Sequence, residues 1–383
     1  MKQISLFDLI EGGEKYQPIV STDWKWKLSD YPMEKNGIKV FSCFACGGGS
    51  TMGYKLAGCE VLGCCEIDEK MNKIYVANHH PKYNFLMDIR DFNNLPNEEI
   101  PEELFDIDVL DGSPPCTTFS IAGDREKSWG KKKKFREGQK EQTLDDLSFV
   151  FIGTVKKLRP KVVVMENVEG LLFGNAWEYV QKIYKGFHEA GYDVNHWVVK
   201  GENMGVPQAR HRSIFVAVRK DLFVDVRKID MGFNYVPIHY GAFKDGNGAA
   251  VTEKMRMILE EATDDEKDGV AAWNRLFNPG GQQKRMYFNA ILVHNDNVFP
   301  TISAGHNCRF DYENKKQVSK MDIIHASTFP EDYNFISDTF SNVNYVCGMS
   351  VPPVMMKRVI TRLIDEGVFD YKQNTNTTHQ NQK

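Results

Sequence analysis

Hydrophobic and polar positions alternate with a regular rhythm through the first half of the chain. Apolar runs with the length of strands occur at 38–44, 60–66, 85–89, 105–110, 161–165, 193–199 and 213–218. Segments with the helical spacing of apolar residues lie between several of them, at 51–57, 69–78, 144–158 and 177–190. Strands separated by single helices predict a doubly wound α/β sheet.

The rhythm breaks after Arg219. Residues 220–318 contain glycine-rich and acidic stretches and predict a second, smaller and irregular domain. An apolar helical pattern returns at about 343–363 and predicts that the chain rejoins the first domain. The predicted division is an N-terminal extension of unknown role (1–36), a first domain (37–219), a second domain (220–318), a returning segment (319–372) and a disordered polar tail (373–383).

Composition and charge narrow the class of protein. The chain has 383 residues, of which 42% are apolar and 26% are charged, as in ordinary globular proteins. No apolar run approaches the roughly 18 residues that a membrane span needs, and no signal-peptide pattern is present, so no membrane partner is expected. Eight scattered cysteines suggest reduced thiols in a cytoplasmic protein. Because the net charge is -4, any contact with nucleic acid must come from local basic patches.

One prolyl turn is the most informative stretch. Pro114 and Pro115 follow the predicted strand 105–110 after three residues and come directly before Cys116. Proline fixes the backbone angle φ, so two prolines in series hold the approach to the thiol in one shape. Covalent catalysis depends on where the attacking atom points, and we therefore predict that Cys116 is a nucleophile.

A glycine turn precedes the first predicted helix. Gly47, Gly48 and Gly49 allow a sharp turn and the close approach of a ligand. Glu66 ends the next predicted strand, where an acid can bond ribose hydroxyls, and Asp88 ends the third, where it could take an adenine amino group. No Walker-type lysine follows the glycines, which favours a nucleoside without a triphosphate. The alternative, a turn that binds nothing, is disfavoured by the two acids.

Two further motifs carry polar chemistry. Glu166 ends the predicted strand 161–165, at the edge where α/β folds bind ligands. An acid and the Cys116 thiol in one crevice suit attack on an electron-poor ring that must be protonated elsewhere. Arg210 and Arg212 are spaced by two in an extended segment, and their guanidinium forks suit a carboxylate, a carbonyl oxygen or a phosphate. The alternatives without a function are that Glu166 only caps the end of a strand and that Arg210 and Arg212 are a solvated pair on the surface.

A basic run lies downstream of the predicted nucleophile. Residues 125–140 include four consecutive lysines, Lys131, Lys132, Lys133 and Lys134. Such a run is usually a solvated loop. Its position just after Cys116 favours a lid that grips phosphate.

These motifs, in this order, resemble the cytosine-5 DNA methyltransferases, which use S-adenosylmethionine. The resemblance covers about 38–218 and 299–364, and it includes the spacing from Leu147 to Glu166 and the strings 299–305 and 348–353. It implies a Rossmann-like methyltransferase sheet with a smaller target-recognition domain in 220–318. It also implies duplex DNA as substrate, S-adenosylhomocysteine as product and no metal.

The resemblance implies roles for individual residues. Cys116 attacks carbon 6 of a flipped-out cytosine, Glu166 protonates or hydrogen-bonds ring nitrogen 3, and Arg210 holds the oxygen at position 2 and orients Glu166, with support from Arg212. The residues that match cofactor contacts are Phe44, Gly47, Gly48, Gly49, Glu66, Ile67, Asp88, Ile89, Pro115 and Leu147. The expected DNA contacts are Ser120, Lys131, Lys132, Lys133, Lys134 and Gln208.

The resemblance also sets expectations about context. A monomer is expected, in the cytoplasm of a bacterium or encoded by a phage and associated with the nucleoid. A cognate restriction endonuclease that acts separately is a further expected partner. Three departures from the family pattern stand out: Cys46 replaces a glycine, Met349 replaces an asparagine, and 320–322 reads Lys-Met-Asp.

Three alternatives stay open at this point. Some members of the superfamily methylate cytosine in transfer RNA. A DNA-binding protein with a degenerate active site would lack the chemistry, although Cys116, Glu166 and Arg210 are intact. A zinc module would use the cysteines Cys43, Cys46, Cys64 and Cys65.

Overall fold

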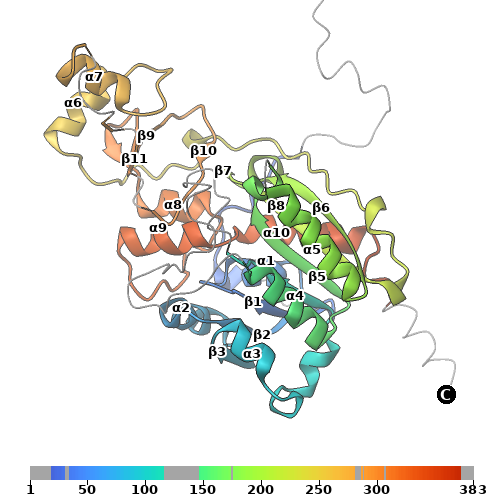
Figure 1. Ribbon diagram of the computed structural model, residues 1–383. Helices are drawn as coiled ribbons and strands as arrows, with labels where there is room; N and C mark the ends of the chain where they lie inside the picture. The colour runs from blue at the N-terminus through green and yellow to red at the C-terminus, as the bar shows by residue number, and fades with distance from the viewer. Residues whose placement is uncertain are drawn as a thin grey trace, which may run out of the picture.

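A seven-stranded sheet organises the chain (Figure 1). This computed structural model describes residues 19–30, 34–115, 146–173, 176–280, 286–287, 289–305 and 308–371. The strand order is β3-β2-β1-β4-β5-β8-β6. The bounds are β1 Lys39–Cys43, β2 Glu60–Glu66, β3 Tyr83–Leu86, β4 Val109–Gly112, β5 Val162–Val168, β6 Tyr192–Lys200 and β8 His211–Arg219. Strands β3 to β5 are mutually parallel, whereas β8 runs antiparallel to β5 and β6. The predicted α/β class with a doubly wound sheet is confirmed.

Helices cover both faces of this sheet because alternate strand residues are apolar on both sides. In β5, Val163 and Met165 face one core and Val162 and Val164 face the other. The first core is closed by α3 (Ile89–Asn94), α4 (Leu147–Leu158) and α5 (Trp177–Glu189), and the second by α1 (Gly49–Leu56) and α10 (Pro353–Asp365). Helix α2 (Glu69–His79) packs in a third core with the returning segment.

Local chemistry moved several predicted boundaries. The single helix expected at 343–363 is two helices, α9 (Phe340–Met349) and α10, because Pro352 and Pro353 cannot continue α9. Strand β4 starts later than predicted, since a 3-10 turn occupies Glu102–Asp106. Strand β5 runs on to Val168, so Glu166 lies inside the strand rather than at its end.

Residues 220–318 are more regular than the sequence predicted. They contain α6 (Glu253–Glu261), α7 (Val270–Phe277) and a sheet of β9 (Ala290–Val293), β11 (Cys308–Asp311) and β12 (Lys316–Gln317). Ile258, Leu259 and Trp273 belong to a separate apolar core there. Figure 1 shows this group set apart from the large sheet. A short ladder between β7 (Gln208–Ala209) and β10 (Phe299–Pro300) connects the two parts, and α8 (Lys320–Ala326) follows.

Residues 19–30 have a structural place that sequence reasoning left open. The Trp26 indole donates to the carbonyl of Thr328 at 3.0 Å, and Asp23 forms ion pairs with Lys357 and Arg358 at 2.9 and 2.7 Å. The segment therefore ties the loop after α8 to the start of α10.

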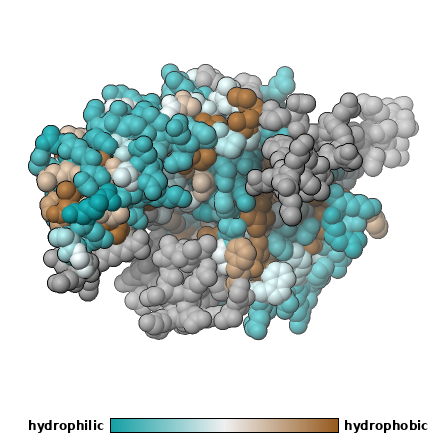
Figure 2. All heavy atoms as spheres, turned by 90° about the horizontal axis from the view of Figure 1, so that it is seen from above, coloured by the Kyte–Doolittle hydropathy of each residue, from teal (hydrophilic) through white to brown (hydrophobic). Residues whose placement is uncertain are grey.

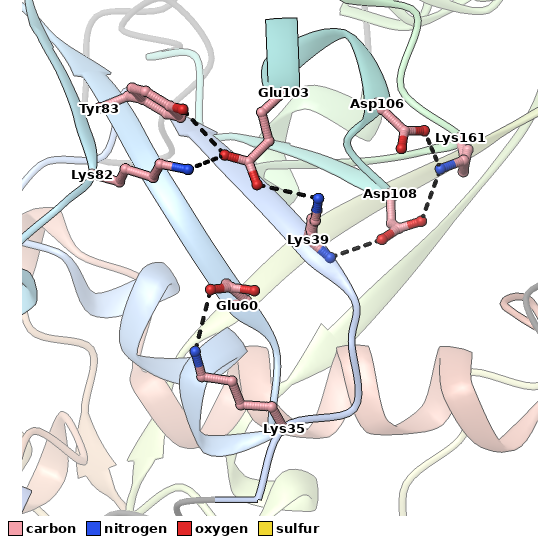
Figure 3. Close-up of polar contacts among 9 residues, drawn as sticks. All are labelled: Lys35, Lys39, Glu60, Lys82, Tyr83, Glu103, Asp106, Asp108 and Lys161. Carbon is pink, nitrogen blue, oxygen red and sulfur yellow. Dashed lines mark hydrogen bonds and ion pairs between the residues drawn. The ribbon is translucent and has the colours of Figure 1, made fainter. Parts of the chain in front are cut away.

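Charged side chains gather at the amino ends of the parallel strands (Figure 3). Asp108, which is 1% exposed, accepts from the Lys39 amide at 2.8 Å and from the Lys161 ammonium at 3.2 Å. The Tyr371 hydroxyl donates to the same carboxylate at 3.1 Å. Lys161 also pairs with the exposed Asp106 at 2.8 Å. This network stabilises the amino ends of the strands. A binding site can therefore form at the opposite, carboxyl ends.

No helix in the described ranges is long and apolar enough to cross a membrane. Seen from above in Figure 2, the described surface is mainly hydrophilic, and its hydrophobic residues form small separate patches.

We predict that Asp108→Ala lowers the free energy of unfolding by about 2–4 kcal/mol, because a partly buried ammonium, hydroxyl and amide lose their fully buried acceptor. Chemical denaturation measures this loss. The control is Asp106→Ala, which removes the 76%-exposed partner of the same lysine and should cost about 0.5 kcal/mol or less. Equal losses would contradict the assignment of the network to Asp108.

Candidate active site

A pocket opens at the carboxyl ends of β1, β2 and β4. The space between its lining residues, counted together with the open solvent at its mouth, is about 780 Å³. Its wall contains the predicted residues Phe44, Glu66, Ile67, Asp88, Ile89, Pro115 and Leu147. The sequence did not single out the other lining residues, Cys46, Cys65, Asp68, Met71, Met87, Ser113, Tyr345 and Met349, as pocket positions, although it noted Cys46 and Met349 as departures. Tyr345 and Met349 come from α9, so the returning segment completes the wall.

Glu66 is held in place by backbone amides. Its Oε2 accepts from the Cys46 amide at 2.7 Å and its Oε1 from the Asp68 amide at 2.8 Å. Burial raises the pKa of Glu66, and these amide bonds offset the shift only in part. Each carboxylate oxygen keeps a lone pair for a hydroxyl. With the apolar side chains of Phe44 and Ile89 beside it, the site fits a ribose and an adenine ring.

Asp88 lies at the start of α3 rather than at the end of β3. Its carboxylate caps the helix by accepting from the Arg90 amide at 2.8 Å. The Arg90 guanidinium pairs with Asp146 at 2.6 Å, directly before Leu147. The ion pair joins the starts of α3 and α4 beside the pocket.

The three glycines serve packing more than ligand approach. None of them is among the residues that line the pocket in the described chain. A β-carbon on Gly47 would meet Val346, one on Gly48 would meet His79, and one on Gly49 would meet the Val351 carbonyl. The absence of a β-carbon lets α2 and the α9–α10 junction approach the turn, and contact of these glycines with a cofactor stays a prediction.

Glu166 is the central residue of the polar site. The Arg212 Nε and the Glu166 Oε1 form an ion pair at 2.7 Å, and the Glu166 residue is 8% exposed. The side-chain amide of the next residue, Asn167, donates to the carbonyl of Pro114 at 3.1 Å. Strands β4 and β5 pair Gly112 with Met165. The prolyl turn and the acid are thus held together at neighbouring strand ends.

Comparison with known proteins decides the family. The family model for C-5 cytosine-specific DNA methylases matches residues 38–365. The chain belongs to this family. A type II methyltransferase, M.NgoPII of Neisseria gonorrhoeae, is 24% identical to this methylase over 358 residues, covering 84% of this chain and 94% of the relative. M1.HphI of Haemophilus parahaemolyticus is 25% identical over 370 residues, covering 92% and 91%. The predicted family and the enzyme class, a DNA (cytosine-5-)-methyltransferase dependent on S-adenosylmethionine, are confirmed.

Solved structures agree on the fold. A putative DNA modification methyltransferase from an Escherichia coli prophage superposes on the methylase with a TM-score of 0.63 at 17% identity, covering 86% of this chain and 99% of that one. A DNMT2 from Spodoptera frugiperda gives 0.58 at 15% identity, covering 86% and 100%. At these identities the likeness concerns the fold alone.

Glu166 is paired with a different arginine from the one that the sequence analysis expected. Arg212, and not Arg210, pairs with Glu166. Arg210 is 3% exposed and donates to the carbonyls of Ile302 and Gly348 at 3.1 and 3.2 Å. The Arg210 amide bonds the Gln208 carbonyl two residues back at 2.8 Å, a tight turn that separates β7 from β8 and breaks the two-residue alternation. Burial lowers the pKa of Arg210 to about 9.

Gln208 is not placed to contact DNA, which corrects its prediction. The residue is 1% exposed, its amide donates to the Ala326 carbonyl at 3.1 Å, and its oxygen accepts from the Ile302 amide at 3.1 Å. Both polar ends are occupied within the fold. The remaining predicted site residues, Cys116, Ser120, Lys131, Lys132, Lys133 and Lys134, lie outside the described residues.

The cysteines of the zinc alternative do not converge. Cys43 and Cys65 belong to the core under α3 and α4, whereas Cys64 points to the opposite face against Tyr75. Cys46 lies in the pocket wall. Within the ranges described above, no three ligand-type side chains are grouped as a metal would need.

We predict that Arg212→Met mainly lowers turnover, whereas Arg210→Met mainly lowers stability. Loss of the Glu166 partner should lower kcat about 10²-fold or more even in protein that remains folded. Loss of Arg210 should lower the free energy of unfolding by about 2–4 kcal/mol, because two buried carbonyls lose their donor. Denaturation and single-turnover methylation measure the two effects. The opposite pattern would restore the assignment made from the sequence.

Proposed function

We propose that this methylase transfers a methyl group to carbon 5 of a flipped-out cytosine in duplex DNA, through a transient covalent bond to Cys116. The observation that carries the proposal is the hydrogen bond from Asn167 to Pro114 beside the Glu166–Arg212 pair. It holds the prolyl turn, which leads directly into Cys116, next to an acid that is already oriented. A base must leave the duplex to reach such a recessed site.

Each step of the proposed reaction has a group in this chain. The Cys116 thiolate forms a bond to carbon 6 while Glu166 supplies a proton or hydrogen bond to ring nitrogen 3, so the negative charge that develops on the ring is stabilised. Carbon 5 then acts as the nucleophile and gains the methyl group. Loss of the carbon-5 proton to solvent and departure of the Cys116 sulfur restore the aromatic ring. Arg212 keeps Glu166 aimed and is our candidate for the oxygen at position 2.

The pocket is the proposed site for S-adenosylmethionine, which supplies an electrophilic methyl group when bound. Glu66 would accept from the ribose hydroxyls, and Asp88 from the adenine amino group. Phe44, Ile89 and Leu147 would enclose the adenine. No metal takes part in the proposed reaction.

DNA contacts are proposed from the basic run and from residues 220–318. Ser120 and the lysines 131–134 would approach the phosphates near the flipped base. Residues 220–318, as the target-recognition domain, would read base edges in the major groove. The relatives named type II methyltransferases support a separately acting restriction endonuclease as partner, and we propose that the methylase acts as a monomer.

Covalent capture tests the chemistry. Bisulfite sequencing of DNA from cells that express the protein first identifies the methylated sequence. A duplex with 5-fluorocytosine at the target should then form a covalent adduct with the wild type, because fluorine cannot leave carbon 5 as a proton does. Cys116→Ala should form none and should retain less than about 10⁻³ of the turnover.

Cys59→Ala is the matched control, since Cys59 is buried next to β2 outside the pocket, and it should form the adduct normally. An adduct with Cys116→Ala would refute the assignment of the nucleophile. Transfer RNA serves as the competing substrate, and faster methylation of tRNA than of duplex DNA would replace DNA as the substrate.

We predict that changing lysines 131–134 to alanine weakens DNA binding and flattens its salt dependence. If each lysine neutralises one phosphate, the slope of log K against log salt should fall by about 3–4. Lys185→Ala, on the exposed face of α5, should leave the slope unchanged. An unchanged slope in the quadruple variant would mean that the run does not contact phosphate.

A further inference from the structure

A buried carboxylate lies between the two turns of the active site. Asp111, on β4, is 1% exposed. Its Oδ2 accepts from the Ser42 hydroxyl at 2.7 Å and from the Ser50 hydroxyl at 2.8 Å, and its Oδ1 accepts from the Tyr54 hydroxyl at 3.3 Å. Neither the proposed chemistry nor the proposed cofactor contacts use this acid.

The three hydroxyls come from β1 and α1, the elements on either side of the turn that carries the pocket residues Phe44 and Cys46. Ser42 lies on β1, opposite Asp111 in the ladder, two residues before Phe44. Ser50 and Tyr54 lie on α1, which begins at Gly49. Asp111 itself precedes Ser113 and Pro115, which line the pocket from the β4 side. One side chain therefore connects the residues that flank the glycine turn with the strand that leads into the prolyl turn.

Within the described part of the chain, the groups that face Asp111 include no compensating cation. These groups are Ser42 and Cys43 from β1, Ser50 and Tyr54 from α1, Tyr75 from α2 and Glu166 from β5. Burial raises the pKa of Asp111 to about 6, because its three hydroxyl bonds offset the loss of solvation only in part. A carboxylate kept there without a cation is costly for stability, which points to a role beyond packing.

We propose that Asp111 is a positioning residue that fixes the prolyl turn against the glycine turn and so sets the spacing of the two pocket walls. This inference rests on the proposed cofactor site. Ionised Asp111 accepts all three hydroxyl bonds. Protonated Asp111 must turn one oxygen into a donor, so the hold on α1 weakens as the pH falls through about 6.

The test measures the binding of S-adenosylhomocysteine by calorimetry between pH 5 and 8. Asp111→Ala should bind about 10-fold more weakly than the wild type at pH 8 and by a smaller factor at pH 5, where Asp111 of the wild type is itself protonated. Asp111→Asn imitates the protonated acid. At pH 5 it should therefore bind with the affinity of the wild type, and at pH 8 it should bind about 3-fold more weakly than the wild type. Asp108→Ala is the matched control: it removes a buried acid three residues earlier, at the opposite end of β4, and should lower stability without changing affinity.

A second readout does not depend on the cofactor. Hydrogen exchange in the free protein should rise at the amides of 47–50 and 112–113 in Asp111→Ala and stay unchanged there in Asp108→Ala. Identical affinity and exchange in wild type and Asp111→Ala, or equal effects of the two alanine variants, would overturn the proposal. If the wild type fails to bind S-adenosylhomocysteine, the cofactor assignment fails, and the exchange pattern still decides the role of Asp111.

Discussion

The parallel pairing of β1 to β5 is the constraint on which the rest of the structure depends. The carboxyl ends of parallel strands all lie at the same end of the sheet. Residues from separate parts of the chain meet there, namely Glu66, Ser113, Pro115 and Glu166. The charged network around Asp108 lies at the opposite end, where the strands begin. The same backbone geometry therefore separates a stabilising end of the sheet from a reactive end, and loops at the reactive end can differ without loss of the core.

The segment after β10 shows how the second part of the chain is fastened to the first. Three successive carbonyls are held by three different elements: Thr301 by Arg309 at 2.7 Å, Ile302 by Arg210 at 3.1 Å and Ser303 by Asn344 at 3.1 Å. A backbone with its acceptors occupied in this way has one conformation. The recognition region proposed here would then present its surface to a substrate from a fixed base, with Arg210 as part of that base.

The glycine turn illustrates how one motif can satisfy a fold and a site at once. Phe44 and Cys46 adopt left-handed backbone angles, with φ of 54° and 48°, although neither is glycine. Such conformations cost about 1–3 kcal/mol each and persist where the surroundings hold them. The Glu66 carboxylate bonds the Cys46 amide and helps to hold this turn. The acid that would bind a ribose thus also stabilises the strained wall beside it.

The sequence by itself determined the α/β class, most strands and helices, the prolyl turn, and the positions of Glu66 and Glu166, because apolar period and motif spacing are local properties of the chain. It could not assign Arg210 and Arg212 correctly, since the tight turn between β7 and β8 depends on pairing with β10. Nor could it show that Gln208 is hydrogen-bonded to α8, or that the glycines pack against α2 and α9. It also could not show that Tyr345 and Met349 reach the pocket. Those facts depend on contacts between residues that are from about thirty to about three hundred positions apart, and only the folded packing decides them.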